Sequence, residues 1–136
     1  MSRIYLDANS IIYLVEAVDP FHAIVAARLL SHRTNPESRI VTSRLSRLEC
    51  RIQPLRNADT HLLAKYTDFF SMERIIICEV TAGVIERATD LRVRYNFKTP
   101  DAIHLATAIE EKADLFLTGD KALARCVEVK VEVLAG

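Results

Sequence analysis

The sequence lacks any apolar stretch that could cross a membrane, since none approaches the roughly 20 residues that a spanning helix needs. Its opening residues, MSRIYLDAN, also lack the long apolar region of a secretory signal peptide. The cysteines Cys50, Cys78 and Cys126 are widely spaced and form neither a CxxC pair nor a metal-ligand cluster. We therefore expect reduced, mostly buried thiols in a cytoplasmic protein with no membrane attachment.

The sequence also has no net charge, because 18 basic residues balance 18 acidic ones. Composition alone therefore indicates no nucleic-acid partner. The basic residues are mostly arginine, and the segment 28–56 is rich in them but contains only Glu37 and Glu49 as acids. Arginine is the side chain best suited to bidentate contacts with phosphate. Solvated helix faces remain the alternative for each of these arginines.

Half of the 136 residues are hydrophobic, which is enough to bury the core of one domain spanning residues 1–136. Short apolar runs predict strands at Arg3–Asp7, Arg39–Thr42, Ile75–Cys78 and Leu115–Leu117. Helical periodicity predicts helices at Ser10–Ala17, Phe21–Ser31, Ser43–Arg51, Asn57–Phe70, Thr81–Tyr95 and Pro100–Glu111. This alternation predicts an α/β fold, a three-layer α/β/α sandwich around a central, mainly parallel sheet.

Two further features refine this expectation. Pro54 is expected to end the helix that begins at Ser43. Valines alternate with charged residues from Val127 to Val133, which predicts an edge strand with one exposed face. In such folds ligands bind beyond the carboxyl ends of the strands, so acids at those positions are candidate functional residues.

Asp7 and Asp120 both fall at this edge of the predicted sheet. Asp7 ends the first strand, and Asp120 follows Leu115–Leu117 in the stretch FLTGD. Gly119 is expected to let the chain turn sharply there. Asp101 lies in the stretch TPDAIHLATA, where Thr99 is a suitable N-cap and an acid complements the helix dipole. Helix capping is therefore the structural alternative for Asp101.

Glu49 lies on an apolar stripe of its predicted helix, together with Leu45, Leu48 and Ile52. If this stripe faces the core, Glu49 needs a partner, because burying an unpaired carboxylate is costly. A capping box in which Glu49 closes back on Ser46 is the alternative.

Several carboxylates therefore converge without a basic partner at fixed spacing. Like charges packed together raise one another's pKa unless a cation joins them. Oxygen ligands suit Mg²⁺ or Mn²⁺, and no His/Cys pattern competes for a softer metal. A carboxylate site for divalent ions at the strand ends of an α/β domain indicates phosphate chemistry.

Four stretches in this order resemble the PIN domain, most closely the small single-domain VapC-type toxins of VapBC toxin–antitoxin pairs. They are YLDAN at 5–9, TSRLSRLE at 42–49, TPDAIHLATA at 99–108 and FLTGDKAL at 116–123. Each is weak alone, but together they cover nearly the whole chain in the family's order. The resemblance implies a PIN-like α/β/α sandwich.

The resemblance also implies a metal-dependent endoribonuclease, the toxin component of a type II toxin–antitoxin system. Such an enzyme hydrolyses RNA phosphodiester bonds with metal-activated water and leaves 5′-phosphate and 3′-hydroxyl ends. By motif position, the acids that hold Mg²⁺ or Mn²⁺ are Asp7, Glu49, Asp101 and Asp120. Asn9 and Thr118 take supporting positions, from which they orient ligands or bound water.

The remaining expectations concern partners. Arg44, Arg47 and Arg51 share the helix of Glu49 and are the candidates for RNA phosphate contacts. The family implies a small antitoxin partner, in a homodimer or a toxin–antitoxin hetero-oligomer. His104 lies one turn from Asp101 and is assigned no catalytic role, because a lone histidine is more often structural. Lys121, beside Asp120, is a weaker candidate for a role at the site.

Two other classes of function remain open. One is a catalytically silent PIN-like module that binds RNA or protein. The other is a phosphorelay receiver, which needs an acceptor aspartate after its middle strand. The strand at Ile75–Cys78, interpreted as that middle strand, is followed instead by Glu79 and Val80, which argues against a receiver.

Overall fold

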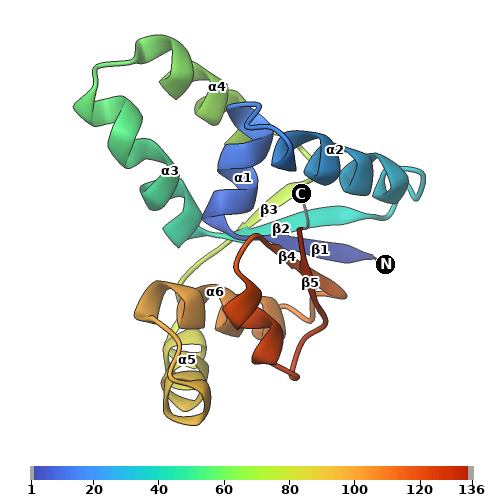
Figure 1. Ribbon diagram of the computed structural model, residues 1–136, viewed down its shortest axis with the longest axis vertical. Helices are drawn as coiled ribbons and strands as arrows, with labels where there is room; N and C mark the ends of the chain where they lie inside the picture. The colour runs from blue at the N-terminus through green and yellow to red at the C-terminus, as the bar shows by residue number, and fades with distance from the viewer. Residues whose placement is uncertain (1, 135–136) are drawn as a thin grey trace.

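A five-stranded sheet lies between two layers of helices in the computed structural model, which describes residues 2–134 (Figure 1). The strands are β1 (Arg3–Leu6), β2 (Arg39–Ser43), β3 (Ile75–Cys78), β4 (Leu115–Thr118) and β5 (Val131–Val133). The helices are α1 (Ala8–Val15), α2 (Phe21–His32), α3 (Arg44–Arg56), α4 (Thr60–Phe70), α5 (Ala82–Tyr95) and α6 (Thr99–Glu110), with a short 3-10 helix η1 (Lys121–Arg125). The predicted three-layer α/β/α sandwich is confirmed.

The sheet has the strand order β3-β2-β1-β4-β5, and every neighbouring pair is parallel. The chain builds outward from β1 to β3 on one side, then crosses to β4 and β5 on the other. The crevice at the carboxyl ends of β1 and β4 is therefore the point where the winding direction reverses, which is where open α/β sheets bind ligands.

Side-chain alternation along the central strands divides the core into two halves. Tyr5 and Phe116 pack with residues of α5 and α6, whereas Leu6 and Leu117 pack with residues of the layer formed by α1 to α4. All four residues are fully buried. Strands that are apolar on both faces suit the centre of a parallel sheet. In agreement with this rule, β1 is the middle strand of the five.

The expected position of Ile75–Cys78 is wrong. This segment is β3, which lies at the edge of the sheet, and β1 is the middle strand. Receiver domains follow the strand order 2-1-3-4-5, which differs from the order found here. The strand order itself therefore argues against the receiver alternative.

Several predicted boundaries shift because local capping decides them. Helix α1 begins directly after Asp7, two residues earlier than expected, and α4 begins after Asp59, three residues later. In both cases the aspartate side chain accepts a hydrogen bond from a backbone N–H of the first turn. Edge strand β5 covers only Val131–Val133, and Val127 is 82% exposed. The 3-10 helix η1 had not been predicted.

Helix α3 continues through Pro54 to Arg56, which contradicts the expected end at Arg51. Proline removes one backbone donor, but near the end of a helix only one intrahelical bond is lost, and its fixed φ remains helical. Ser43 caps the helix by accepting a bond from the N–H of Leu45 at 3.0 Å. The alternative start at Ser46 is therefore not adopted.

The apolar stripe of α3 faces outward, opposite to the prediction. Leu48 is 56% exposed and Ile52 is exposed as well, whereas Ser46, Cys50 and Pro54 form the buried side. Small residues on the buried side let α3 lie close to α1, where the thiol of Cys50 contacts the carbonyl oxygen of Ala8 at 3.8 Å. The periodicity indicated the helix correctly but not which face it buries.

Among residues 2–134, no helix is both long and apolar enough to span a membrane.

Two leucine substitutions test this arrangement. Leu105 on α6 is fully buried, so Leu105→Ala is expected to lower the free energy of unfolding by about 2–5 kcal/mol. Leu48→Ala removes the same atoms from an exposed position and is expected to change it by no more than about 0.5 kcal/mol. Urea denaturation at low protein concentration measures both. A loss at Leu48 as large as that at Leu105 would contradict the outward orientation of α3.

Candidate functional site

Asp7 is placed by the central strand β1 and held by the helix that follows it. It is the N-cap of α1, and its Oδ1 accepts a hydrogen bond from the N–H of Ser10 at 2.9 Å. The Ser10 hydroxyl in turn donates to the carbonyl oxygen of Leu117 on β4 at 3.0 Å. These bonds fix the buried Asp7 side chain at the crevice between β1 and β4.

Asp120 lies across this crevice, two residues after β4. It is the N-cap of η1, with Oδ1 accepting from the N–H of Ala122 at 2.9 Å. The buried hydroxyl oxygen of Thr118 accepts a hydrogen bond from the N–H of Asp120 at 3.1 Å, so Thr118 orients the loop that carries the acid. The chain bends at Gly119 as expected, although its φ is not positive. A Cβ there would lie only 3.1 Å from the Tyr13 hydroxyl, so Gly119 makes room for that ring.

Asp101 lies in the first turn of α6, half-buried at the carboxyl edge of the sheet. The expected cap is wrong: Lys98 is the N-cap, without a side-chain bond, and Thr99 is already helical. The Thr99 hydroxyl instead accepts a hydrogen bond from Arg92 at 2.9 Å. Asp101 thus lies at a helix N-terminus, whose partial positive charge favours an anion.

Glu49 lies on the second turn of α3, at the boundary between the buried and exposed sides of the helix. Its side chain is 30% exposed, and its Oε1 lies 2.7 Å from Nε2 of His104 on α6. Glu49 therefore has the partner that the sequence required, although the reasoning from a core-facing stripe was wrong. The sequence contained one signal for this partner, since His104 lies one turn after Asp101 on α6.

The electrostatics of Asp101 bring the four acids together. Burial raises the pKa of Asp101, and the negative charges of Asp120, Asp7 and Glu49 raise it further, whereas His104 acts in the opposite direction. The other three acids are thus close enough to Asp101 to influence its ionisation. Within residues 2–134, no ion pair joins Asp7, Asp101 or Asp120 to a lysine or arginine.

The donor set fits a hard divalent cation in chemistry. Carboxylate oxygens are the ligands that Mg²⁺ and Mn²⁺ prefer, and the caps of Asp7 and Asp120 use only Oδ1 of each. As the side chains lie, however, no three His, Cys, Asp or Glu residues within 2–134 converge closely enough to hold an ion. The site therefore supplies uncompensated negative charge rather than a closed ligand cage.

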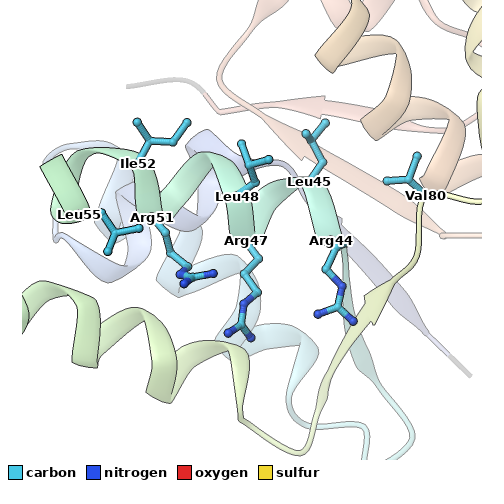
Figure 2. Close-up of a pocket in the computed structure, with 8 residues that line it drawn as sticks. All are labelled: Arg44, Leu45, Arg47, Leu48, Arg51, Ile52, Leu55 and Val80. Carbon is cyan, nitrogen blue, oxygen red and sulfur yellow. The ribbon is translucent and has the colours of Figure 1, made fainter.

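The other candidate residues lie around this cluster. Asn9 is exposed on the first turn of α1, and Lys121 is exposed at the start of η1. Arg44 is not a free cation, since its Nη2 lies 2.6 Å from Glu79 in an exposed ion pair. Arg47 and Arg51 extend from the same side of α3, as Figure 2 shows.

An open groove runs along α3 beside these arginines. Its volume is about 480 Å³. The residues that line it are Arg44, Leu45, Arg47, Leu48, Arg51, Ile52, Leu55 and Val80 (Figure 2). The helix that carries Glu49 thus presents a surface of mixed apolar and basic character.

Replacing Asp101 with asparagine is expected to stabilise the metal-free fold at neutral pH. Because the pKa of Asp101 is raised in the folded state, its contribution to stability is full at low pH and is lost as the pH rises through that raised value. Asparagine carries no charge and avoids this loss. Urea denaturation in EDTA, below pH 3.8 and at about pH 7, measures the difference between variant and wild type.

Asp68→Asn provides the matched control, since Asp68 lies on the exposed side of α4. The control is expected to leave stability nearly unchanged at both pH values. A gain for Asp101→Asn that is equal at the two pH values would show that charge repulsion is not its cause.

Comparison with known proteins was made at the level of family, sequence and structure. A family model for the PIN domain matches residues 4–128. No curated protein sequence gives a significant match.

Solved structures provide similar folds over almost the entire chain. VapBC from Salmonella typhimurium bound to DNA is 15% identical, with a TM-score of 0.78, and the match covers 99% of this chain and 100% of that one. VapBC2 from Rickettsia felis bound to a promoter DNA fragment is 18% identical, with a TM-score of 0.77 and coverage of 98% and 99%. VapC20 from Mycobacterium tuberculosis, a toxin that cleaves the sarcin-ricin loop, is 22% identical, with a TM-score of 0.69 and coverage of 93% and 98%. The family model, the sandwich fold and the order of the four motifs agree, and the chain belongs to the PIN domain family.

Proposed function

We propose that this protein is a metal-dependent endoribonuclease, the toxin component of a type II toxin–antitoxin system. The observation that carries the proposal is the cluster of four acids beside the crevice between β1 and β4. There burial raises the pKa of Asp101, and the charges of Asp120, Asp7 and Glu49 raise it further. Such a cluster destabilises the metal-free protein and suits a divalent cation. Membership of the PIN domain family supports nuclease chemistry.

Asp7, Glu49, Asp101 and Asp120 would hold the ion, which we propose to be Mg²⁺ or Mn²⁺. When bound, the metal would supply a Lewis acid that acidifies water and offsets the charge that develops on the phosphoryl oxygens. The protein contributes the positions of the acids. Backbone N–H groups hold one oxygen of Asp7 and one of Asp120, so each retains a second oxygen for the site. Thr118 supports Asp120 through its hydrogen bond to the backbone. The exposed Asn9 would orient bound water or substrate.

RNA would approach over the basic side of α3. Arg47 and Arg51 lie on the helix that carries Glu49, and guanidinium groups bind phosphates bidentately. Arg44 would contribute less, because Glu79 already occupies its guanidinium group. Lys121, next to Asp120, is a further candidate for phosphate contact.

An antitoxin partner is part of the proposal. Several solved structures of similar fold are toxin–antitoxin complexes, including one from Klebsiella pneumoniae that is 22% identical. A groove of about 750 Å³ between α1, α2 and α4 offers apolar surface to a partner or to a second copy. Leu14, Leu29, Leu30, Phe69 and Met72 line it. In this proposal the protein acts on cellular RNA in the cytoplasm until the antitoxin covers the site.

The first prediction from this proposal concerns Asp7. The purified protein, free of antitoxin, is expected to cut total cellular RNA into discrete fragments with Mg²⁺ or Mn²⁺ and to leave it intact with EDTA. Asp7→Asn is expected to reduce cleavage at least about 100-fold. Removing a residue that only supports a metal ligand costs up to about 100-fold, and the loss of a ligand itself should cost at least as much. Asparagine caps helices as well as aspartate, so α1 is expected to stay folded. Gel analysis and end mapping of the fragments measure the effect.

Asp59→Asn is the matched control, because Asp59 caps α4 through the same kind of bond, at 3.0 Å, but lies outside the acidic cluster. It is expected to cleave like the wild type. Full cleavage by Asp7→Asn would remove Asp7 from the mechanism. RNA binding without cleavage by the folded wild type, with either metal, would favour the catalytically silent PIN-like module.

The second prediction concerns Arg47. In the Asp7→Asn background, Arg47→Gln is expected to weaken binding of single-stranded RNA and to reduce the slope of log affinity against log salt by about 0.7, because one phosphate contact is lost. Fluorescence anisotropy at several salt concentrations measures this slope. Arg87→Gln, which removes the same charge on α5, is the control. An equal loss at Arg87 would mean that only net charge matters.

A further inference from the structure

His104 is almost completely buried, at 3% exposure, yet both of its ring nitrogens have hydrogen-bond partners. Its Nε2 lies 2.7 Å from Oε1 of Glu49 on α3, and its Nδ1 lies 2.7 Å from the hydroxyl of Tyr5 on β1. Three elements thus meet at one ring. The bond to Glu49 crosses the carboxyl edge of the sheet, because α3 and α6 cover opposite faces (Figure 1).

The chemistry of the partners determines the direction of each hydrogen bond. The Glu49 carboxylate has no proton to donate, so Nε2 of His104 donates to it. A neutral imidazole that donates through Nε2 accepts at Nδ1, so the Tyr5 hydroxyl donates to Nδ1. The neutral Nε2–H tautomer satisfies both contacts.

Tyr5 is itself rigidly placed. It is fully buried on the central strand and stacks on Phe116, with ring centroids 5.0 Å apart and an angle of 6° between the planes. The ring of His104 packs against Tyr5 edge-on at 5.9 Å. The position of the imidazole is therefore set by the most buried part of the sheet and not by solvent.

We propose that His104 is a positioning residue that directs Glu49 to the metal site, with Tyr5 fixing the tautomer and orientation of the ring. Glu49 has a long, partly exposed side chain, and without His104 it would sample several rotamers. The bond to Oε1 restrains the carboxylate at the site and leaves Oε2 as the oxygen available for the metal. This inference rests on the proposed function, since it assigns Glu49 to the metal.

Mn²⁺ affinity tests the proposal without relying on cleavage. Free Mn²⁺ is measured by electron paramagnetic resonance during titration of the wild type and variants. His104→Leu is expected to weaken binding about 10-fold or more, the loss typical of removing an outer partner of a metal ligand. His104→Gln, whose amide N–H can still reach Glu49, is expected to recover most of the affinity.

A double-mutant cycle separates positioning from general damage to the fold. In a Glu49→Ala background, His104→Leu is expected to change Mn²⁺ affinity by less than about twofold, because the residue through which it acts is gone. His104→Leu removes one hydrogen-bond partner of the buried Tyr5 hydroxyl and is expected to lower the stability of the fold. The double variant Tyr5→Phe/His104→Leu removes both polar groups and keeps the shapes similar. It replaces His104→Leu in the cycle if that single variant does not fold.

The outcomes are distinct. Loss of affinity that requires Glu49 and is rescued by glutamine supports the proposal. An equal loss in the Glu49→Ala background, or no loss with either His104 variant, overturns the positioning role while Mn²⁺ binding and RNA cleavage by the wild type leave the proposed function intact. A wild type that neither binds Mn²⁺ nor cleaves RNA overturns both.

Discussion

Carboxylates gathered at one edge of a sheet repel one another, and in this molecule no lysine or arginine within residues 2–134 is paired with Asp7, Asp101 or Asp120. Burial raises the pKa of Asp101, and this repulsion raises it further. The arrangement persists because the rest of the fold holds the acids in place. Because the pKa of Asp101 is raised, its ionised form lowers the stability of the folded state.

Helix dipoles help to hold the acids in place. Asp7 caps α1, Asp120 caps η1, and Asp101 lies in the first turn of α6, so three of the acids are at helix N-termini. Partial positive charge and unpaired N–H groups at those ends favour an anion without adding a competing cation. Glu49 lies in the second turn of its helix, beyond the reach of this effect, and receives a hydrogen bond from His104 instead.

The fold and the position of Asp7 and Asp120 at one edge of the sheet could be predicted because they depend on patterns that are local in sequence. Apolar runs indicated the strands, and parallel topology placed Asp7 and Asp120 at the same edge. The orientation of α3 could not be predicted this way, because its buried side consists of small residues that pack closely on α1, and its leucines are left outside. His104 was missed for a related reason: its partners Tyr5 and Glu49 are 99 and 55 residues away, and no periodicity links them.

The position of β1 explains why the acidic cluster depends on the packing of the whole molecule. This strand carries Tyr5 into the core on one face, ends directly before Asp7, and lies beside β4, which leads to Asp120. Glu49 and Asp101 come from helices in opposite layers, so the acids meet only when both layers are packed on the sheet. The acidic cluster is therefore a property of the complete fold. A divalent cation that bound these acids would bind the folded state alone, and its binding free energy would add to the stability of the whole molecule.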